Sequence, residues 1–187
     1  MPATMRSVTA ERGMDREQFR AAQGPLKERY RQAPETALVT LSANGSLDDQ
    51  EVACSVQTGR ALVRAGLHPA TGGSGTLACS GDMLLEALVA CAGVTLRSVA
   101  TSLEIPAMGT VHAEGDLDFR GTLGVASDDE APVGFRAIRL TFVLESEATD
   151  EELETLMKLT ERYCVVFQTL AGGVPVTCQL RASGAPS

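Results

Sequence analysis

The N-terminal stretch of the chain is rich in charged residues, with apolar residues only at scattered positions. Between residues 15 and 31 this pattern predicts a weakly amphipathic helix. Gly24 and Pro25 fall inside it, and we expect an interruption there because proline lacks the backbone N–H that a helix interior needs. The change of pattern beyond it predicts an N-terminal helical arm at residues 1–36 and a folded domain at residues 37–187.

Short β-like runs and a glycine-rich loop open the expected domain. Three segments have the residue pattern of strands, at residues 37–41, 52–57 and 61–65. Asn44-Gly45 is a turn signal after the first of them. Residues 66–81 contain a proline and several glycines, which predicts a loop.

A long apolar segment follows this loop. Residues 82–103 are nearly all apolar, and a helix that is apolar on all sides is a buried helix. Ser80 is the expected N-cap, and Asp82 falls in the first turn, where the helix dipole favours a negative charge. The strongly apolar stretch at residues 87–96 has about half the length that a membrane span needs. We therefore expect the central helix of a layered domain and no membrane span.

Strict alternation of apolar and polar residues marks further strands. It occurs at residues 111–120, 138–145 and 174–180. A period of two residues is typical of strands that have one buried face and one face in water. We expect two long strands after the central helix and one short strand near the end of the chain.

A second helix is expected between these strands. Thr149 and Glu152 form a capping box, and an apolar stripe then runs through Cys164 to Phe167 before Gly172 ends the helix. The order is three strands, a helix, two strands, a helix and a final strand. Because strands and helices do not alternate regularly, we expect an α+β fold with a mostly antiparallel sheet and two buried core helices.

Composition and charge narrow the function classes. Hydrophobic residues make up 44% of the chain, enough for a real core. The 16 basic and 24 acidic residues give a net charge of −8, which disfavours nucleic acid as a partner. The first residues lack the apolar region of a secretory signal, so we expect a cytoplasmic protein with reduced thiols.

The five cysteines are the candidate chemistry of the chain. They are odd in number and widely spaced, without a Cys-x-x-Cys pair, at positions Cys54, Cys79, Cys91, Cys164 and Cys178. Cys54 and Cys178 fall on the inward faces of expected strands, and Cys79 lies in the loop before the central helix. Cys91 and Cys164 each lie on an inward face of a core helix. If those helices cross, the two thiols form a candidate peroxidatic and resolving pair; core filling is the alternative that their spacing leaves open.

Two motifs around these cysteines resemble a known family. The loop that begins His68-Pro-Ala-Thr-Gly-Gly precedes a helix reading Leu-Leu-Glu-Ala-Leu-Val-Ala-Cys up to Cys91, with Thr-Leu shortly after it. This pattern resembles the OsmC/Ohr family, the osmotically inducible protein C and organic hydroperoxide resistance proteins. A second match is Glu161–Leu170, where the family has its second cysteine opening a helical segment. The resemblance excludes residues 1–36.

The resemblance implies an OsmC-like fold and a function in the oxidative stress response. It implies a thiol-dependent peroxidase that reduces organic hydroperoxides, works as an intertwined homodimer and takes a small hydrophobic peroxide. Cys91 corresponds to the peroxidatic nucleophile and Cys164 to the resolving cysteine. It implies no bound cofactor and no metal, and an external dithiol, lipoyl-type in family members, as the reductant.

The sequence leaves the activation of Cys91 open. In the hydroperoxide-resistance branch an Arg and a Glu supply charge to the nucleophile, but Gly81 stands ten positions before Cys91 and residues 45–50 contain no Arg. His68 and Asp82 are possible supporting residues. On a regular helix Asp82 points about 180° away from Cys91, and His68 is equally interpretable as a loop residue.

The missing charged pair favours an alternative function, an OsmC-like binding protein for an apolar ligand without peroxidase activity. Metal binding through His68, Cys79 and Cys91 lacks a recognised ligand spacing.

Overall fold

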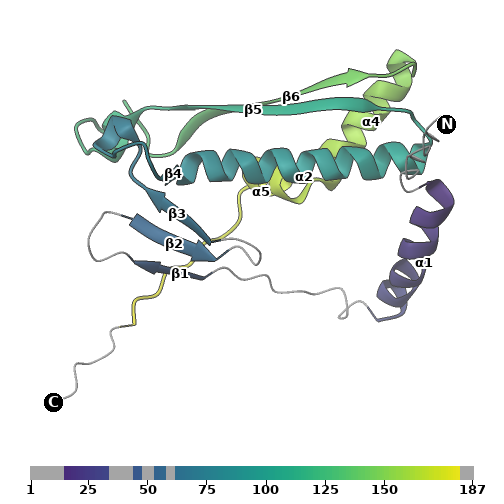
Figure 1. Cartoon of the computed structure of the whole chain (residues 1–187), viewed down its shortest axis with the longest axis horizontal. Coiled ribbons are helices and arrows are strands. Elements are labelled where there is room, and N and C mark those ends of the chain that lie inside the picture. Colours follow the sequence, from purple (N-terminus) through teal and green to yellow (C-terminus); the bar gives the residue numbers. More distant parts are fainter. Residues whose placement is uncertain (1–14, 34–43, 48–52, 58–61, 182–187) are drawn as a thin grey trace, which may run out of the picture.

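The computed structural model, shown in Figure 1, describes residues 15–33, 44–47, 53–57 and 62–181. Its helices are α1 (Arg16–Gln32), α2 (Ser80–Leu103), α3 (Phe119–Thr122), α4 (Asp150–Tyr163) and α5 (Val165–Gly172), with a short 3₁₀ turn, η2 (Pro69–Thr71). Its strands are β1 (Asn44–Leu47), β2 (Ala53–Gln57), β3 (Leu62–Gly66), β4 (Ala78–Cys79), β5 (Met108–Leu117) and β6 (Phe135–Glu145). This is the mixed α+β composition that the sequence predicts.

Helix α2 is the axis of the molecule, and the other elements pack around it. The long β5–β6 ribbon runs along one side of α2, and α4 and α5 also contact it (Figure 1). The small sheet that contains β4 lies at the N-terminal end of α2, whereas α1 lies at its C-terminal end (Figure 1). Every other helix except α3 therefore packs directly on α2.

The strands form two separate sheets among the described residues. One has the order β1-β2-β3-β4, antiparallel except for the parallel pair β3–β4, and the other is the antiparallel pair β5–β6. Three of these four strand pairs are antiparallel, but the described strands form two sheets and not one. Exposed and half-buried residues alternate along most of β5 and β6, and β5 packs on α2; Met108 and Val143 are apolar residues that stay exposed.

The hydrophobic core lies where α2, α4 and the β5–β6 ribbon meet. Its buried members are Leu96, Val99, Ala100, Ile105, Ala107 and Leu156. Thr160 is the buried polar residue of this region, and its hydroxyl donates a hydrogen bond to the Leu156 carbonyl at 2.7 Å. That bond removes the cost of an unpaired hydroxyl in an apolar core. The core fixes the C-terminal half of α2 against α4.

Burial of α2 is one-sided, which differs from the predicted helix buried all round. The helix is long and apolar enough to cross a membrane by length and composition. Here it serves as the core helix, since it packs on β5, α4 and α5. Apolar residues nevertheless remain exposed on it, and Val94 is 69% exposed. A helix that is apolar on all sides but covered on only one leaves an apolar face without a partner in the single chain.

Helix α1 runs through Gly24 and Pro25 without interruption, so the predicted break is wrong. Proline removes one helix bond, to the carbonyl of Ala21, and the helix tolerates this loss because that carbonyl lies at an exposed position, open to solvent. A capping box of Asp15 and Gln18 starts the helix. An ion pair between Arg16 and Glu104 ties α1 to the end of α2.

Two other local predictions around the small sheet are wrong. Asn44-Gly45 lies within β1, paired with β2, and does not form a turn. Cys79, not Ser80, is the N-cap of α2, and its side chain makes no capping hydrogen bond. The glycine-rich loop also contains β4, which pairs with β3. The predicted strand at residues 37–41 lies outside the described residues.

The predicted final strand is also wrong for the single chain. Residues 174–180 lie beyond the end of α5 and pair with no strand that the structure describes. Val176 and Leu180 are 88% and 94% exposed, and Cys178 is exposed rather than inward-facing. An alternating pattern forms a strand only where the edge of a sheet accepts its hydrogen bonds, and this segment pairs with none of the described strands.

Replacement of Leu156 by alanine tests the core. Leu156 is completely buried between α4 and α2, so the truncation should lower the free energy of unfolding by about 2–5 kcal/mol. Urea denaturation followed by circular dichroism measures this loss. Leu123→Ala is the matched control, because Leu123 is 54% exposed and its truncation should cost less than about 0.5 kcal/mol. Equal losses in the two variants would contradict the placement of the core.

Candidate active site

Cys91 lies in the N-terminal half of α2, half-buried, next to the fully buried Ala92. Its thiol is free. Because α2 is held by the core further along its length, the position of this thiol is set by a well-packed helix rather than by a loop. The neighbouring element that reaches it is the start of α5.

Cys164 lies at a break between α4 and α5. It is at once the C-cap of α4 and the N-cap of α5, with extended backbone angles (φ −76°, ψ 108°), and it is only 1% exposed. Its N–H donates to the Thr160 carbonyl at 3.0 Å, and its carbonyl accepts from the Gln168 N–H at 2.9 Å. The Gln168 side chain also donates to the Glu161 carbonyl across the break, at 2.9 Å. The prediction of one uninterrupted helix is therefore wrong at this residue.

The break brings three hydrogen-bonding groups to the sulfur of Cys91. The Cys164 thiol and the backbone N–H groups of Val165 and Val166 lie beside it, and each of them lowers its pKa. These two N–H groups belong to the first two residues of α5, and the first N–H groups of a helix have no acceptor within the helix. They also mark the positive end of the helix dipole, which favours a negative charge on the sulfur.

The pKa of Cys91 reflects this arrangement. Burial raises the pKa of the thiol, but the bonds from Val166, Cys164, Val165 and the Thr95 side chain together outweigh burial. The net effect is a pKa below the ordinary value for cysteine. Each of the groups that lower it is neutral, so the thiolate is stabilised by hydrogen bonds and not by a neighbouring cation.

The pKa of Cys164 moves in the opposite direction. Burial is the largest effect and raises the pKa of this thiol. The Phe167 N–H lowers the pKa, the hydrogen bond and negative charge of Cys91 raise it again, and the Val166 N–H opposes them weakly, so the net pKa lies above the ordinary value. The pair is therefore asymmetric. Cys91 is the thiol that ionises first, and Cys164 stays protonated and donates to it.

His68 and Asp82 lie elsewhere. Both line a pocket of about 370 Å³ at the N-terminal end of α2, together with Cys79, and neither is among the groups that shift the pKa of Cys91. The His68 ring accepts a hydrogen bond from the Ala70 N–H at 3.1 Å and stacks on Phe119, with the ring centroids 4.7 Å apart. His68 thus shapes the loop. Among the described residues no group of three His, Cys, Asp or Glu is arranged to hold a metal ion.

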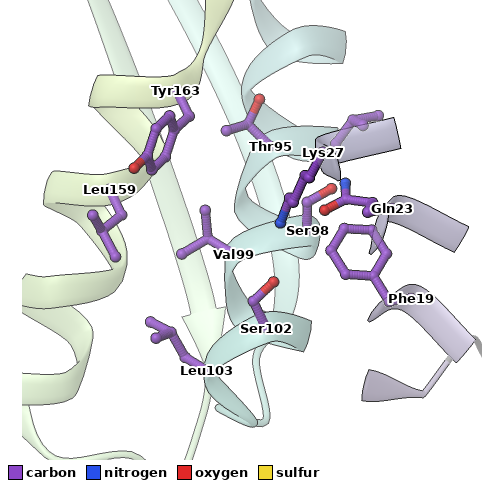
Figure 2. A pocket seen from close by; sticks show the side chains of 11 residues that line it. Phe19, Gln23, Lys27, Thr95, Ser98, Val99, Ser102, Leu103, Leu159 and Tyr163 are labelled. Atoms are coloured by element: carbon purple, nitrogen blue, oxygen red, sulfur yellow. The ribbon is translucent and has the colours of Figure 1, made fainter. Parts of the chain in front are cut away.

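An open cavity lies near the cysteine pair, although neither cysteine lines it. It has a volume of about 490 Å³ and lies between α1, α2 and α4 (Figure 2). Thr95 connects it to the nucleophile, because its hydroxyl donates to the Cys91 carbonyl at 2.8 Å and its side chain also helps to lower the pKa of that thiol. Tyr163, on the α4 wall, directly precedes Cys164.

Sequence reasoning missed Val165 and Val166, because they act through backbone N–H groups that carry no side-chain signature. The signal that points to them is indirect. A cysteine that opens a helical segment places the first N–H groups of that helix beside its own thiol. The sequence does not show that Cys91 of α2 lies beside the start of the same helix, α5; the fold does.

Comparisons with solved structures give the fold. An OsmC-like protein from Mycoplasma pneumoniae aligns with a TM-score of 0.59 and 16% identity, covering 72% of this chain and 89% of that chain. An organic hydroperoxide resistance protein from Elizabethkingia anophelis, with thiocyanate bound, aligns with a TM-score of 0.57 and 17% identity, covering 73% of this chain and 91% of that chain. An OsmC-like protein of unknown function from Vibrio cholerae aligns with a TM-score of 0.51 and 15% identity, covering 71% and 94%.

The sequence comparison gives the family. No curated protein matches the chain. The family model for OsmC-like protein matches residues 73–179, a range that contains α2, α4, α5 and both site cysteines. The chain therefore belongs to the OsmC-like protein family.

Proposed function

We propose that the protein is a thiol-dependent peroxidase that reduces organic hydroperoxides, with Cys91 as the nucleophile and Cys164 as the resolving cysteine. The observation that carries this proposal is the contact of the Cys91 thiol with the Cys164 thiol and with the first N–H groups of α5. A peroxidatic cysteine needs a stabilised thiolate and a second thiol within reach. The described arrangement offers both at one point.

The first step is the attack of the Cys91 thiolate on the distal oxygen of the hydroperoxide. A sulfur–oxygen bond forms and the oxygen–oxygen bond breaks, so the sulfur is oxidised to a sulfenic acid and the peroxide is reduced. The leaving alkoxide takes up a proton and departs as an alcohol. The Val165 and Val166 N–H groups hold the sulfur in its ionised state until the attack.

The second step regenerates the site. The Cys164 thiol, as its thiolate, attacks the Cys91 sulfenic sulfur, which releases water and forms a Cys91–Cys164 disulfide. An external dithiol, of lipoyl type in the proposal, then reduces this disulfide by exchange and becomes a disulfide itself. The high pKa of Cys164 suits this order, because a protonated Cys164 does not compete with Cys91 for the peroxide.

We further propose that the protein acts as a homodimer. The exposed apolar residues of α2 and the alternating segment at residues 174–180 support this, since the segment has the pattern of a strand but pairs with none of the described strands. A second copy covers both surfaces with residues of this same sequence. The site lies close to the uncovered face of α2, so the dimer also shields the cysteine pair from water.

A specific observation also favours a second function, an apolar-ligand binding protein without peroxidase activity. The cavity near Cys91 is mostly apolar, and no charged side chain lowers the pKa of that thiol. The two functions differ in whether Cys91 is consumed and regenerated.

Turnover of cumene hydroperoxide with dihydrolipoamide separates the two functions. The wild-type protein should consume the peroxide continuously, and Cys91→Ser should lower kcat/KM at least about a thousandfold, because serine at neutral pH supplies no comparable nucleophile. Cys164→Ser should still react once and keep a Cys91 sulfenic acid that dimedone labels, as mass spectrometry of the intact protein will reveal.

Cys79→Ser is the matched control for this experiment, because Cys79 is a half-buried free thiol outside the contacts of Cys91. It should keep the wild-type rate. Wild-type turnover no greater than that of Cys91→Ser, with dihydrolipoamide and with dithiothreitol, would exclude the peroxidase and leave the binding function.

Light scattering coupled to size-exclusion chromatography tests the dimer. The protein should elute with twice the chain mass of 19.6 kDa at micromolar concentration. Val176→Asp places a charge in the alternating segment and should shift the population to the monomer. Val125→Asp is the control, since Val125 is similarly exposed but lies in the turn after α3. A wild-type protein that elutes as a monomer would contradict the proposal.

A further inference from the structure

The break at Cys164 changes the partners of two backbone groups. In a continuous helix the Val165 N–H would donate to the carbonyl of Glu161, four residues earlier. The preceding bond of such a helix, donated by the Cys164 N–H, is present, but among the described residues the Val165 N–H makes no such bond. It lies instead beside the sulfur of Cys91. The break therefore deprives the Glu161 carbonyl of its helix donor.

The side chain of Gln168 takes the place of that donor. Its amide nitrogen donates to the Glu161 carbonyl at 2.9 Å. Its backbone N–H donates to the Cys164 carbonyl, also at 2.9 Å, and this is the first bond of α5. Gln168 thus ties the first turn of α5 to the last turn of α4 and satisfies a carbonyl that the end of a helix leaves open.

Two donors compete for the Glu161 carbonyl. If the Val165 N–H donates to it, α4 and α5 merge into one helix and Cys91 loses that N–H. If the Gln168 amide donates to it, the break is kept and the N–H stays directed at the sulfur. A carbonyl that is already satisfied from a side chain gives the continuous helix less to gain, because the net value of a hydrogen bond depends on what it replaces.

We propose that Gln168 is a positioning residue for the nucleophile: by occupying the Glu161 carbonyl, it keeps the Val165 N–H available to Cys91. This role rests on the proposed function insofar as Cys91 is the peroxidatic thiol. Gln168 acts through the backbone of its own helix and needs no contact with the sulfur or the peroxide. It is exposed on α5, so its side chain is separate from the hydrophobic core.

Charged side chains do not account for the state of the Cys91 thiol. Among the main effects on its pKa, only that of Cys164 comes from a titratable side chain. Helix α5 contains no ionisable residue. Ionisable residues of the packed elements that are absent from these main effects include Glu86 and Arg97 on α2, Glu161 and Arg162 on α4, and His112 on β5. An uncharged substitution of Gln168 therefore changes the pKa through the N–H and not through a charge.

Gln168→Met tests this role, because methionine matches glutamine in length and helix propensity but donates no hydrogen bond. The pH profile of iodoacetamide alkylation at Cys91, resolved by peptide mass spectrometry of the reduced full-length protein, gives the pKa of that thiol. Gln168→Met should raise this pKa by about half a unit and slow alkylation at neutral pH about threefold. Gln168→Ala should act in the same direction, although alanine favours a helix more than glutamine does.

Thr169→Met is the matched control, since it places the same side chain at the next exposed position of α5. It should leave the pKa of Cys91 unchanged. An unchanged pKa in Gln168→Met, or an equal rise in Thr169→Met, would overturn the proposal.

A double-mutant cycle identifies the group through which Gln168 acts. Val165→Pro removes the N–H itself, and proline is suited to the first position of a helix. This substitution alone should raise the pKa of Cys91, and Gln168→Met should then add nothing in the Val165→Pro background. Additive rises would show that Gln168 acts on the thiol by another route and would contradict the proposal.

Turnover of cumene hydroperoxide separates this proposal from the proposed function. Gln168→Met should lower kcat/KM about threefold at neutral pH, and the deficit should disappear above the pKa of Cys91 in both proteins. Wild-type turnover with no pKa change in Gln168→Met would refute only the role of Gln168. The pKa change without any turnover in the wild-type protein would refute the proposed function alone.

Discussion

The chemistry of the site depends on one break in the chain. At Cys164 the backbone leaves the helical conformation for a single residue and then starts α5, so that the first N–H groups of α5 point at the sulfur of Cys91. Without this break Val165 and Val166 would bond within a continuous helix, and Cys91 would face only apolar burial, which raises a thiol pKa. The same residue also supplies the second thiol, so activation and resolution share one structural element.

Helix α2 holds Cys91 in position for this contact. Its C-terminal half is fixed by the core with Leu156 and its neighbours, and its N-terminal half carries Cys91 to the start of α5. The one-sided burial of α2 leaves exposed apolar residues, among them Val94 and Leu103, which support the proposed dimer and also line the cavity between α1, α2 and α4 (Figure 2). A single helix thus links stability and thiol chemistry.

The sequence predicts the elements with strong periodic signals. The two long strands, the apolar helix α2 and the capping box of Thr149 and Glu152 are confirmed, because each arises from local spacing and hydrogen bonding. The turn at Asn44, the break at Pro25 and the strand at residues 174–180 are wrong, because tertiary pairing and solvent exposure override local preference there. The contact of Cys91 with Cys164 follows from helix crossing, which the sequence permits but does not specify. The activating N–H groups have no side-chain signature, so the sequence offers only His68 and Asp82 as possible supporting residues.

The most direct measurement of the central claim is the pKa of Cys91, from thiolate absorbance at 240 nm against pH, with the titration of Cys91→Ser subtracted. Val165→Pro removes one N–H donor and preserves α5, since proline suits the first position of a helix and the extended Cys164 before it. The wild-type protein should show a Cys91 pKa below the ordinary value, and Val165→Pro should raise it, whereas Val165→Ala, which keeps the N–H, should not. An unshifted wild-type pKa, or the same pKa in all three proteins, would contradict activation by the start of α5.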